Sequence, residues 1–362
     1  RGTEFMDLMS LFNSAMRVRK ETGKSITAQF SEALRLRLSR TALSPSEYYE
    51  YHLYEDGMAF DAKRDYLGWR KSRELDRALN LDSWRACAND KLLFHSLLHG
   101  LGFPLPRIRA IYNASGRQFD GAVSLVDTDS VRNYLQFDAP YPLFVKPIVG
   151  SFGRGAIALS AYDPEHDRIF LANGESMRSN DLLRSFDFDP FEGQLFQDVL
   201  KPDPDIEARC GNRICSVRVS IVLHRHRPRV LYAVWKIATG RNMTDNLAGG
   251  KAGNLTGWVN PDTGVVERVA RGMGDHYTEV SHHPDTGERL LGYALPGWKP
   301  ALDLCLNAAT ALPGLRLQNW DIALCDTGPV ILEVNTESDL GPDQLYGRRG
   351  FFSAFASAQQ QR

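Results

Sequence analysis

The sequence predicts an α+β protein with a helical first part and a β-rich remainder. Up to about residue 104, apolar residues recur at intervals of three and four, which is the spacing of one helix face. From about residue 105, short β-branched runs alternate with Gly, Pro, Asp and Asn, as strands alternate with turns. Two later stretches return to helical spacing, so helices and antiparallel hairpins are mixed in the C-terminal two thirds.

Three segments of the first part carry helix signals. Residues 31–43 (SEALRLRLSRTAL) and 89–102 (NDKLLFHSLLHGLG) have apolar side chains at helical spacing, and the second segment ends at a glycine before a proline. Residues 44–57 (SPSEYYEYHLYEDG) begin with a Ser-Pro cap and predict a tyrosine-rich helix that packs on a neighbour. Later helices are expected within 180–186 and 299–312.

The strands of the remainder are predicted by six β-branched runs. These runs are residues 141–147, 155–162, 193–200, 216–224, 229–238 and 256–269, the last of which holds two strands and a turn.

The triplet Asp-Thr-Gly occurs three times, at 262–264, 285–287 and 326–328. A pepsin-like protease carries its catalytic carboxylate on this triplet, usually followed by Ser or Thr. Here Val, Glu and Pro follow, and two copies stand within Pro-Asp-Thr-Gly. We therefore interpret the triplets as β-turns.

Composition and charge narrow the function classes. The 362 residues are 43% hydrophobic and 24% charged, which is typical of a soluble globular protein with two or three compact units. No run of about 18 apolar residues is present to span a membrane. The net charge is −1, so we expect neither nucleic acid nor a membrane as a partner. Five scattered cysteines predict no disulfide framework and a cytoplasmic location.

The stretch KPIVGSFGRG, residues 146–155, follows a strand and has three glycines. Glycines let the backbone approach an anion and turn its amide groups toward it, and Ser151 adds a hydroxyl. The stretch lacks the Gly-Lys-Ser/Thr ending of a Walker loop, and a strand follows it instead of the helix of a dinucleotide fingerprint. It predicts a glycine lid over a triphosphate, and an ordinary hairpin turn is the alternative.

A second constellation lies in NWDIALCDTGPVILEVN, residues 319–335. If Gly328 takes the left-handed conformation in the turn, Asp321 lies across from Glu333, and Asn335 follows on the same face. Opposed carboxylates call for a cation, and carboxylate and amide oxygens suit Mg²⁺. We predict a magnesium site, with an ordinary solvent-facing strand as the alternative. The apolar residues expected on the opposite, buried face are Trp320, Ile322, Leu324, Val330, Leu332 and Val334.

Together, FVKPIVGSFGRG and WDIALCDTGPVILEVN resemble the ATP-grasp superfamily, in which two α+β subdomains close on ATP. The sequence is most similar to the sugar-transfer associated ATP-grasp family, through SVRVSIVL, TDNLAGGKAG, HHPDTGERLLGYALPGW and the C-terminal hairpin. The similarity is good from about residue 135 to 341 and looser from about 45 to 134. It implies an ATP-grasp fold preceded by an α-rich region.

The resemblance implies that two lysines and the glycine lid hold the phosphates of ATP. Lys146 would contact the α and β phosphates, and Lys91 would be a second phosphate lysine in the first turn of its helix. The lid residues implied to contact ATP are Gly150, Ser151, Phe152, Gly153 and Gly155.

The hinge between the subdomains is implied to bind adenine and ribose. Gln197, Asp198 and the backbone near Leu200 would meet adenine. The ribose carboxylate should follow, but the sequence departs from the family pattern there, so Asp205 and Glu207 both stay candidates.

The implied catalytic groups are Arg218 and Lys236, which would face the γ phosphate and the acyl phosphate as it forms. Two Mg²⁺ ions would be held by Asp321, Glu333 and Asn335. On their own, the two basic residues are ordinary strand residues.

The resemblance also implies the reaction, that of an ATP-dependent carboxylate–amine ligase which releases ADP and phosphate and acts in natural-product or polysaccharide-linked biosynthesis. Asp245, Asn246 and Gly250 would lie beside small-molecule carboxylate and amine substrates. A small-molecule kinase on the same fold and a non-catalytic nucleotide-binding module are the alternatives. A monomer or a homodimer is expected.

Five segments are expected along the chain. Residues 1–5, before Met6, read as a vector-derived leader, and residues 6–104 form the α-rich region. Residues 105–200 would be the small ATP-grasp subdomain with the glycine lid, and 201–345 the large subdomain with the magnesium hairpin. Residues 346–362 are expected to be a tail, with a frayed Gln-rich end after Phe355.

Overall fold

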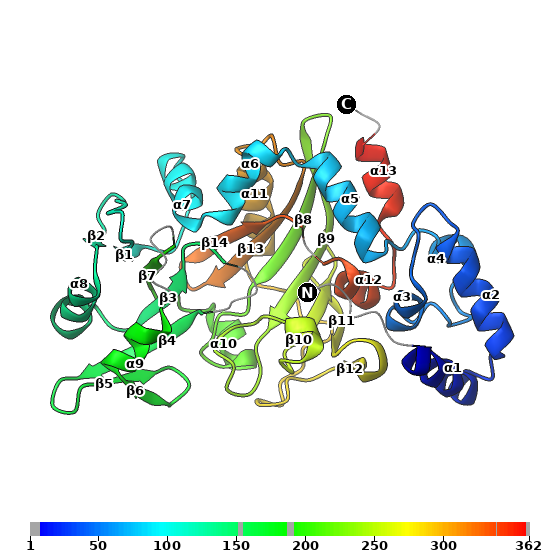
Figure 1. Cartoon of the computed structure of the whole chain (residues 1–362), viewed down its shortest axis with the longest axis horizontal. Helices are drawn as coiled ribbons and strands as arrows, with labels where there is room; N and C mark the ends of the chain where they lie inside the picture. Colours follow the sequence, from blue (N-terminus) through cyan, green and yellow to red (C-terminus); the bar gives the residue numbers. More distant parts are fainter. Residues whose placement is uncertain (1–7, 151–154, 187–191, 338, 360–362) are drawn as a thin grey trace.

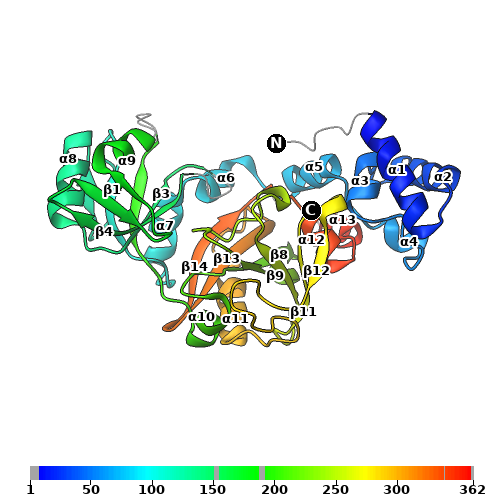
Figure 2. The ribbon, with the colours of Figure 1, turned by 90° about the horizontal axis from the view of Figure 1, so that it is seen from below.

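The computed structural model describes residues 8–359 except 151–154, 187–191 and 338. This part of the chain contains two seven-stranded sheets and a group of N-terminal helices (Figure 1). Figure 2 shows the first sheet at one end of the molecule, the second in the middle and the N-terminal helices at the other end. No helix among the described residues is long and apolar enough to cross a membrane. The α+β prediction is confirmed.

Seven helices form the described N-terminal part of the chain. They are α1 Leu8–Thr22, α2 Ile26–Arg37, α3 Pro45–Glu50, α4 Phe60–Lys63, α5 Trp69–Leu79, α6 Asp82–Asn89 and α7 Lys91–Gly100. Side chains cap the start of three of them, α2, α3 and α7. The Ser44 hydroxyl and the Glu47 side chain form a capping box at the start of α3. The carboxylate of Asp90 accepts from the first amides of α7. The tyrosine-rich helix is shorter than predicted, but its side chains Tyr48 and Tyr49 are buried against α1 and α2, as expected.

The first sheet has the strand order β2-β1-β7-β3-β4-β5-β6. Its strands are β1 Ile108–Tyr112, β2 Val123–Leu125, β3 Leu143–Pro147, β4 Ile157–Asp163, β5 Arg168–Leu171, β6 Ser176–Arg178 and β7 Gln194–Asp198. Only the β1–β2 pair is parallel among the described strands of this sheet. Its helices are α8 Thr128–Asn133, the π-helix η1 Tyr134–Asp138 and α9 Ser179–Ser185, which bury one face of the sheet. The other face, near the ends of β3 and β7, is left to the site.

The second sheet has the strand order β12-β11-β10-β9-β8-β13-β14 and is antiparallel between all its described neighbours. Its strands are β8 Val217–His224, β9 Arg227–Ile237, β10 Leu255–Val259, β11 Val266–Arg271, β12 Thr278–Val280, β13 Leu317–Cys325 and β14 Gly328–Asn335. Short 3₁₀ turns lie at η2 Ala248–Gly250 and η3 Gly274–His276. All six predicted β runs are strands.

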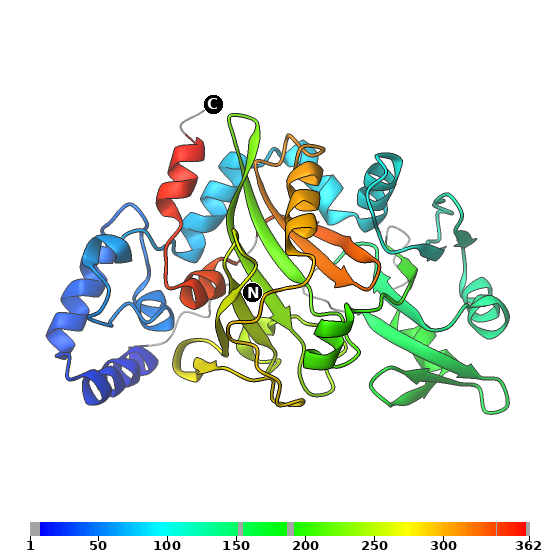
Figure 3. The same cartoon turned by 180° about the vertical axis from the view of Figure 1, so that it is seen from behind.

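The two faces of the second sheet have different covers. Helix α11, Trp298–Ala309, packs its apolar side on one face, and Figure 3 shows it in front of the sheet. At one end of the other face lie α5, α12 Gly341–Gly347 and α13 Phe352–Gln359. The rest of that face is the floor of the site. Helix α10, Pro204–Cys210, connects the two sheets.

The C-terminal hairpin differs from its predicted pattern at one point. Asp321 lies across from Glu333, as predicted, but β14 holds one extra residue, Leu332, before that pair. This β-bulge reverses the alternation of side chains. Ile331 therefore joins the core under α11, whereas Val330 and Leu332 lie on the opposite face. The prediction that put these two residues on the core face is wrong.

The Asp-Thr-Gly triplets all lie in turns, as interpreted from the sequence. Their glycines, Gly264, Gly287 and Gly328, have φ of 74°, 75° and 107°. A Cβ at Gly264 would also lie 2.4 Å from the ring of Trp298, so both conformation and space require glycine there.

The C-terminal residues are helical and packed on the molecule as far as residue 359. Helix α13 buries Phe355 and Ala358 against α5 and the second sheet, together with Phe351 just before it. These contacts hold the segment in place because large apolar side chains leave water there. The expectation of a frayed end after Phe355 is wrong for these residues.

Candidate functional site

A pocket of about 530 Å³ lies between the two sheets. Its walls come from β3, β4 and β7 of the first sheet, from β9, β13 and β14 of the second, and from loops 211–216 and 240–246. The predicted site residues that line it are Lys91, Lys146, Gly150, Gln197, Asp198, Leu200, Lys236, Asp245, Asn246, Asp321 and Glu333. Residues up to 242 positions apart in the sequence, Lys91 and Glu333, therefore line the same pocket.

The carboxylates of the hairpin converge at one side of this pocket. The amide nitrogen of Asn335 donates to Glu333 Oε1 (3.0 Å) and to Asp321 Oδ2 (3.2 Å). Asp321 is 2% exposed, because both neighbouring strands and the core beneath β13 cover it. Alternation on two antiparallel strands thus brings three oxygen-bearing side chains together, as the sequence predicts.

Two cations neutralise Asp321. Strand β8 pairs with β13 so that Arg218 lies directly across from Asp321, and its guanidinium donates through Nε to Oδ1 and through Nη2 to Oδ2, both at 2.8 Å. Lys236 Nζ lies 3.0 Å from Asp321 Oδ2. Burial opposes ionisation of Asp321, but the charges of Arg218 and Lys236 outweigh it and hold its pKa well below the usual range. Asp321 is therefore ionised at any physiological pH.

Lys236 is held between two carboxylates. Its Nζ lies 3.6 Å from Asp245 Oδ1, and Asp245 is itself fixed by the amide (2.7 Å) and hydroxyl (2.5 Å) of Ser216. Burial lowers the pKa of Lys236, but Asp245 and Asp321 together raise it above its ordinary value. The ammonium group is thus charged and fixed in position at the floor of the pocket.

Two further lysines bring positive charge to the pocket from the side of the first sheet. Lys91 Nζ donates to the carbonyl oxygen of Gly150 (2.8 Å), which ties the start of α7 to the glycine segment. Burial lowers the pKa of Lys91, although Glu333 and Asp90 oppose the shift. Burial also lowers the pKa of Lys146, to about 8, because the attraction of Glu333 does not compensate. Both ammonium groups would gain from an anion in the pocket.

The donor set of the hairpin fits Mg²⁺. Two carboxylates and one amide supply the hard oxygen ligands that this ion prefers, and they leave positions for phosphate and water. Asn335 turns its amide nitrogen toward both carboxylates here, so rotation of the amide would bring its oxygen to the ion. Among the described residues, no group of three or more His, Cys, Asp or Glu side chains is placed to hold a metal, and the hairpin offers two carboxylates and one amide.

The hinge strand β7 supplies the predicted adenine-side residues. The side chain of Gln197 is buried and contacts His95 (3.1 Å between the two Nε2 atoms). Asp198 accepts two hydrogen bonds from Arg109, at 2.6 and 2.9 Å. With these side chains engaged, the part of the hinge left to a ligand is its backbone up to Leu200. An adenine edge recognised by backbone groups would suit this arrangement.

Some predicted site residues lie elsewhere. Asp205 and Glu207 are exposed on α10 and line no part of the pocket, so the structure offers neither as a ribose ligand. Helix α10 is capped by the carboxylate of Asp203, which accepts a hydrogen bond from the amide of Asp205. In this helix the side chains of Asp205 and Glu207 face solvent.

Gly250, Arg218 and Asn335 also lie outside the lining. Gly250 packs on the backbone of Gly272. Arg218 and Asn335 instead contact Asp321 at the pocket wall.

Part of the predicted glycine lid cannot be compared with the structure. Ser151, Phe152 and Gly153 lie outside the described residues. Gly155 is exposed, with φ of 72°. The strands β3 and β4 flank the segment and are antiparallel neighbours, so the prediction of a strand on each side of it is confirmed.

Sequence reasoning missed two arginines of the pocket wall. Arg213 donates to the carbonyl oxygen of Gly240 (2.6 Å) and pairs with Asp285, which fixes the loop 240–246. Arg241 donates to the carbonyl oxygen of Asn173 (2.8 Å), in the turn between β5 and β6. This hydrogen bond joins the two sheets across the pocket. No spacing in the sequence marks either arginine, because their partners come from distant segments.

Comparisons with known proteins found a family model and several solved structures that resemble this chain. The family model described as sugar-transfer associated ATP-grasp matches residues 70–360. Comparison with curated proteins gave no significant match. Similar solved structures include the ATP-grasp ligase PsnB complexed with a minimal precursor, with 17% identity, a TM-score of 0.41, and coverage of 78% of this chain and 63% of that one.

Two more solved structures are similar at lower identity. The VanG D-Ala:D-Ser ligase of Enterococcus faecalis has 13% identity, a TM-score of 0.40, and coverage of 77% of this chain and 61% of that one. A biotin carboxylase of Campylobacter jejuni has 10% identity, a TM-score of 0.47, and coverage of 79% and 49%. The chain thus spans 49% to 63% of the length of these three proteins. The family match includes every strand of both sheets, and the chain belongs to the sugar-transfer associated ATP-grasp family.

Proposed function

We propose that the chain is an ATP-dependent ligase that joins a carboxylate to an amine through an acyl phosphate. The observation that carries this proposal is the convergence of Arg218 and Lys236 on Asp321, at the wall of a pocket that Lys91 and Lys146 line from the other side. Phosphoryl transfer to a carboxylate needs positioning and charge neutralisation more than a nucleophilic side chain. The arrangement supplies both.

Four basic side chains at the site would have different roles, according to where each one lies. Lys91 and Lys146 line the pocket on the first-sheet side and would pair with the phosphates of ATP. Burial lowers the pKa of both lysines, and the negative phosphates would stabilise their charged forms. Lys236 lines the floor of the pocket, and Arg218 lies behind it, paired with Asp321. The phosphoryl group and the substrate carboxylate would meet above these two residues. Mg²⁺ held by the hairpin carboxylates and Asn335 would neutralise charge on the transferred group.

The two steps balance without a protein nucleophile. A substrate carboxylate oxygen attacks the γ phosphorus, the bond to the bridging oxygen breaks, and ADP leaves. The amine nitrogen then attacks the acyl carbon, the carbon–oxygen bond breaks, and phosphate leaves with the amide formed. The amine gives up one proton to phosphate or solvent. Arg218 and Lys236 are held rigidly by Asp321, so they would meet the developing charge without reorganisation.

The decisive experiment is a screen for Mg²⁺-dependent ADP release over small carboxylates paired with amines, followed by product mass. An amide product supports the ligase. A phosphorylated substrate that never becomes an amide would make the chain a kinase, and nucleotide binding without turnover for any pair would make it a non-catalytic module. The reaction belongs to natural-product or polysaccharide-linked biosynthesis in this proposal.

A variant of the hairpin gives the control. Glu333→Ala is expected to lower the turnover at least about a hundredfold, because it removes a proposed metal ligand. Asp326→Ala, at the exposed turn of the same hairpin, removes a carboxylate outside the pocket and is expected to leave turnover unchanged. Equal activity of Glu333→Ala and wild type would refute the role given to the hairpin.

A further inference from the structure

The first two helices expose large apolar side chains on their outer surfaces. Within residues 8–38 the exposed large hydrophobic residues are Leu8, Met9, Phe12, Met16, Phe30, Leu34 and Leu38. Most recur every four residues, so each helix carries a stripe beside its buried face. Phe12 is 55% exposed and Phe30 is 68% exposed. Water contact by so many large apolar groups is costly and indicates a surface that binds something.

The same helices carry a strong local excess of positive charge. Residues 8–40 hold seven Lys and Arg and two Asp and Glu, hence a net charge of +5, whereas the whole chain has −1. The exposed basic residues of this region are Arg19, Lys20, Arg35, Arg37 and Arg40. The charge of the whole chain, on which the expectation of no membrane partner rested, averages out this excess.

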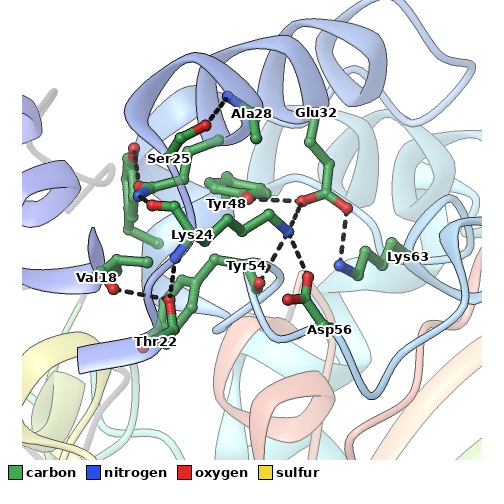
Figure 4. Close-up of polar contacts among 12 residues, drawn as sticks. Val18, Thr22, Lys24, Ser25, Ala28, Glu32, Tyr48, Tyr54, Asp56 and Lys63 are labelled. Carbon is green, nitrogen blue, oxygen red and sulfur yellow. Dashed lines mark hydrogen bonds and ion pairs between the residues drawn. The ribbon is translucent and has the colours of Figure 1, made fainter. Parts of the chain in front are cut away.

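The helices are held firmly to the molecule, so the stripes are displayed from a rigid platform. The carboxylate of Glu32 on α2 accepts from Lys24 (2.5 Å), from Lys63 (2.8 Å) and from the hydroxyl of Tyr48 (2.7 Å), as Figure 4 shows. Lys24 also reaches Asp56 (3.0 Å). Lys24, Lys63, Glu32 and Asp56 thus pair with one another inside this region. The positive charge on its outer surface therefore comes from the exposed arginines and Lys20.

The position of the helices suits a surface separate from the pocket. Figures 1 and 2 show α1 and α2 side by side at the end of the molecule away from the first sheet. They also lie outside the residues matched by the family model, which begin at residue 70. The ATP-grasp part of the chain therefore leaves these two helices to another role.

We infer that α1 and α2 form an interfacial surface that binds membranes with anionic lipid headgroups. An amphipathic helix with Phe and Leu on one side and Arg beside them lies in the plane of a membrane, with its apolar side chains below the headgroups. The arginines would pair with lipid phosphates and carboxylates. A second copy of the chain fits less well, because two surfaces of net charge +5 would repel each other. This inference is independent of the proposed reaction.

The test is flotation of the full chain with vesicles of phosphatidylcholine alone and with phosphatidylcholine mixed with phosphatidylserine. We expect the wild type to bind the mixed vesicles. The double variant Phe12→Ser/Phe30→Ser should bind these vesicles at least about tenfold more weakly. Each Phe side chain that moves from water into the membrane contributes at least about that factor to the affinity. Arg37→Gln should weaken binding roughly fivefold. Thermal unfolding of the variants should match the wild type, because these side chains are exposed.

The matched control is Phe137→Ser, which removes a side chain that is 80% exposed at the far end of the molecule, on the π-helix η1. It should bind vesicles like the wild type. Failure of the wild type to bind mixed vesicles would overturn the inference, as would an equal loss in Phe137→Ser. A wild-type dimer that Phe12→Ser/Phe30→Ser converts to a monomer, without vesicle binding, would assign the surface to a second copy and also overturn it.

Discussion

Replacing Lys146 by Met is expected to stabilise the protein and to weaken ATP binding. Burial lowers the pKa of Lys146 from 10.5 to about 8, with Glu333 opposing the shift and Lys91 adding to it. The difference between these values corresponds to about 3 kcal/mol of unfavourable charging in the folded chain. Methionine keeps the apolar stem and carries no charge, so the free energy of unfolding at pH 7 should rise by about 1 to 3 kcal/mol.

The effect has a defined dependence on pH. Below about pH 8 the lysine is protonated in both the folded and unfolded states, and the full cost is present. Between about pH 8 and 10.5 the unfolded chain binds more protons than the folded chain, so wild-type stability rises with pH. The difference in the free energy of unfolding between Lys146→Met and the wild type should therefore decrease from about pH 8 to 10.5. Urea denaturation at pH 7 and at pH 10 measures it.

Binding should change in the opposite direction. Loss of a charge-assisted contact to phosphate is expected to weaken ATP binding at pH 7 about tenfold to a hundredfold, measured by calorimetry. Lys299→Met removes an exposed lysine on α11 and should change stability by less than about 0.5 kcal/mol and leave ATP affinity unchanged. The reasoning would be refuted by a Lys146→Met protein that is less stable at pH 7, or that binds ATP as the wild type does.

Three further changes test the packing around the site. Arg218→Met leaves the buried Asp321 without its main partner and should cost about 3 to 5 kcal/mol in urea denaturation; recovery in Arg218→Met/Asp321→Asn would tie the loss to the unpaired charge. Burial raises the pKa of Asp343 to about 6, so the folded chain binds the extra proton and stability falls as pH rises from about 4 to 6. Asp343→Asn should gain stability over wild type across that range, and a melting-temperature difference independent of pH would contradict this. Gly314→Ala places a Cβ 2.1 Å from the ring of Trp84 and should destabilise by about 1 to 3 kcal/mol; an unchanged melting temperature would show that α6 moves freely.

Local patterns predicted about half of the described helices and strands and one part of the site. The cap at Ser44 acts within one helical turn, so it could be predicted from neighbouring residues alone. Alternation on two strands joined by a tight turn brings Asp321 and Glu333 opposite each other, because a hairpin is a local structure. The bulge at Leu332 moves Val330 and Leu332 to the face opposite the predicted one. No residue type in this stretch predicts a bulge.

The electrostatics of the pocket could not be predicted from local patterns. Arg218 and Asp321 are 103 residues apart, and only the pairing of β8 with β13 makes them partners. The low pKa of Lys146 likewise depends on burial between two sheets.

Amino-acid order determined the helices, the strands, the turns and the acidic hairpin, because these depend on neighbours within a few residues. The tertiary structure decided which cations meet those carboxylates, that Asp205 and Glu207 face solvent, and that Phe355 is buried. It also decided that Phe12 and Phe30 stay exposed. Strand order and the exclusion of water are properties of the assembled chain, and they set the charge and exposure of a side chain whose identity alone leaves both open.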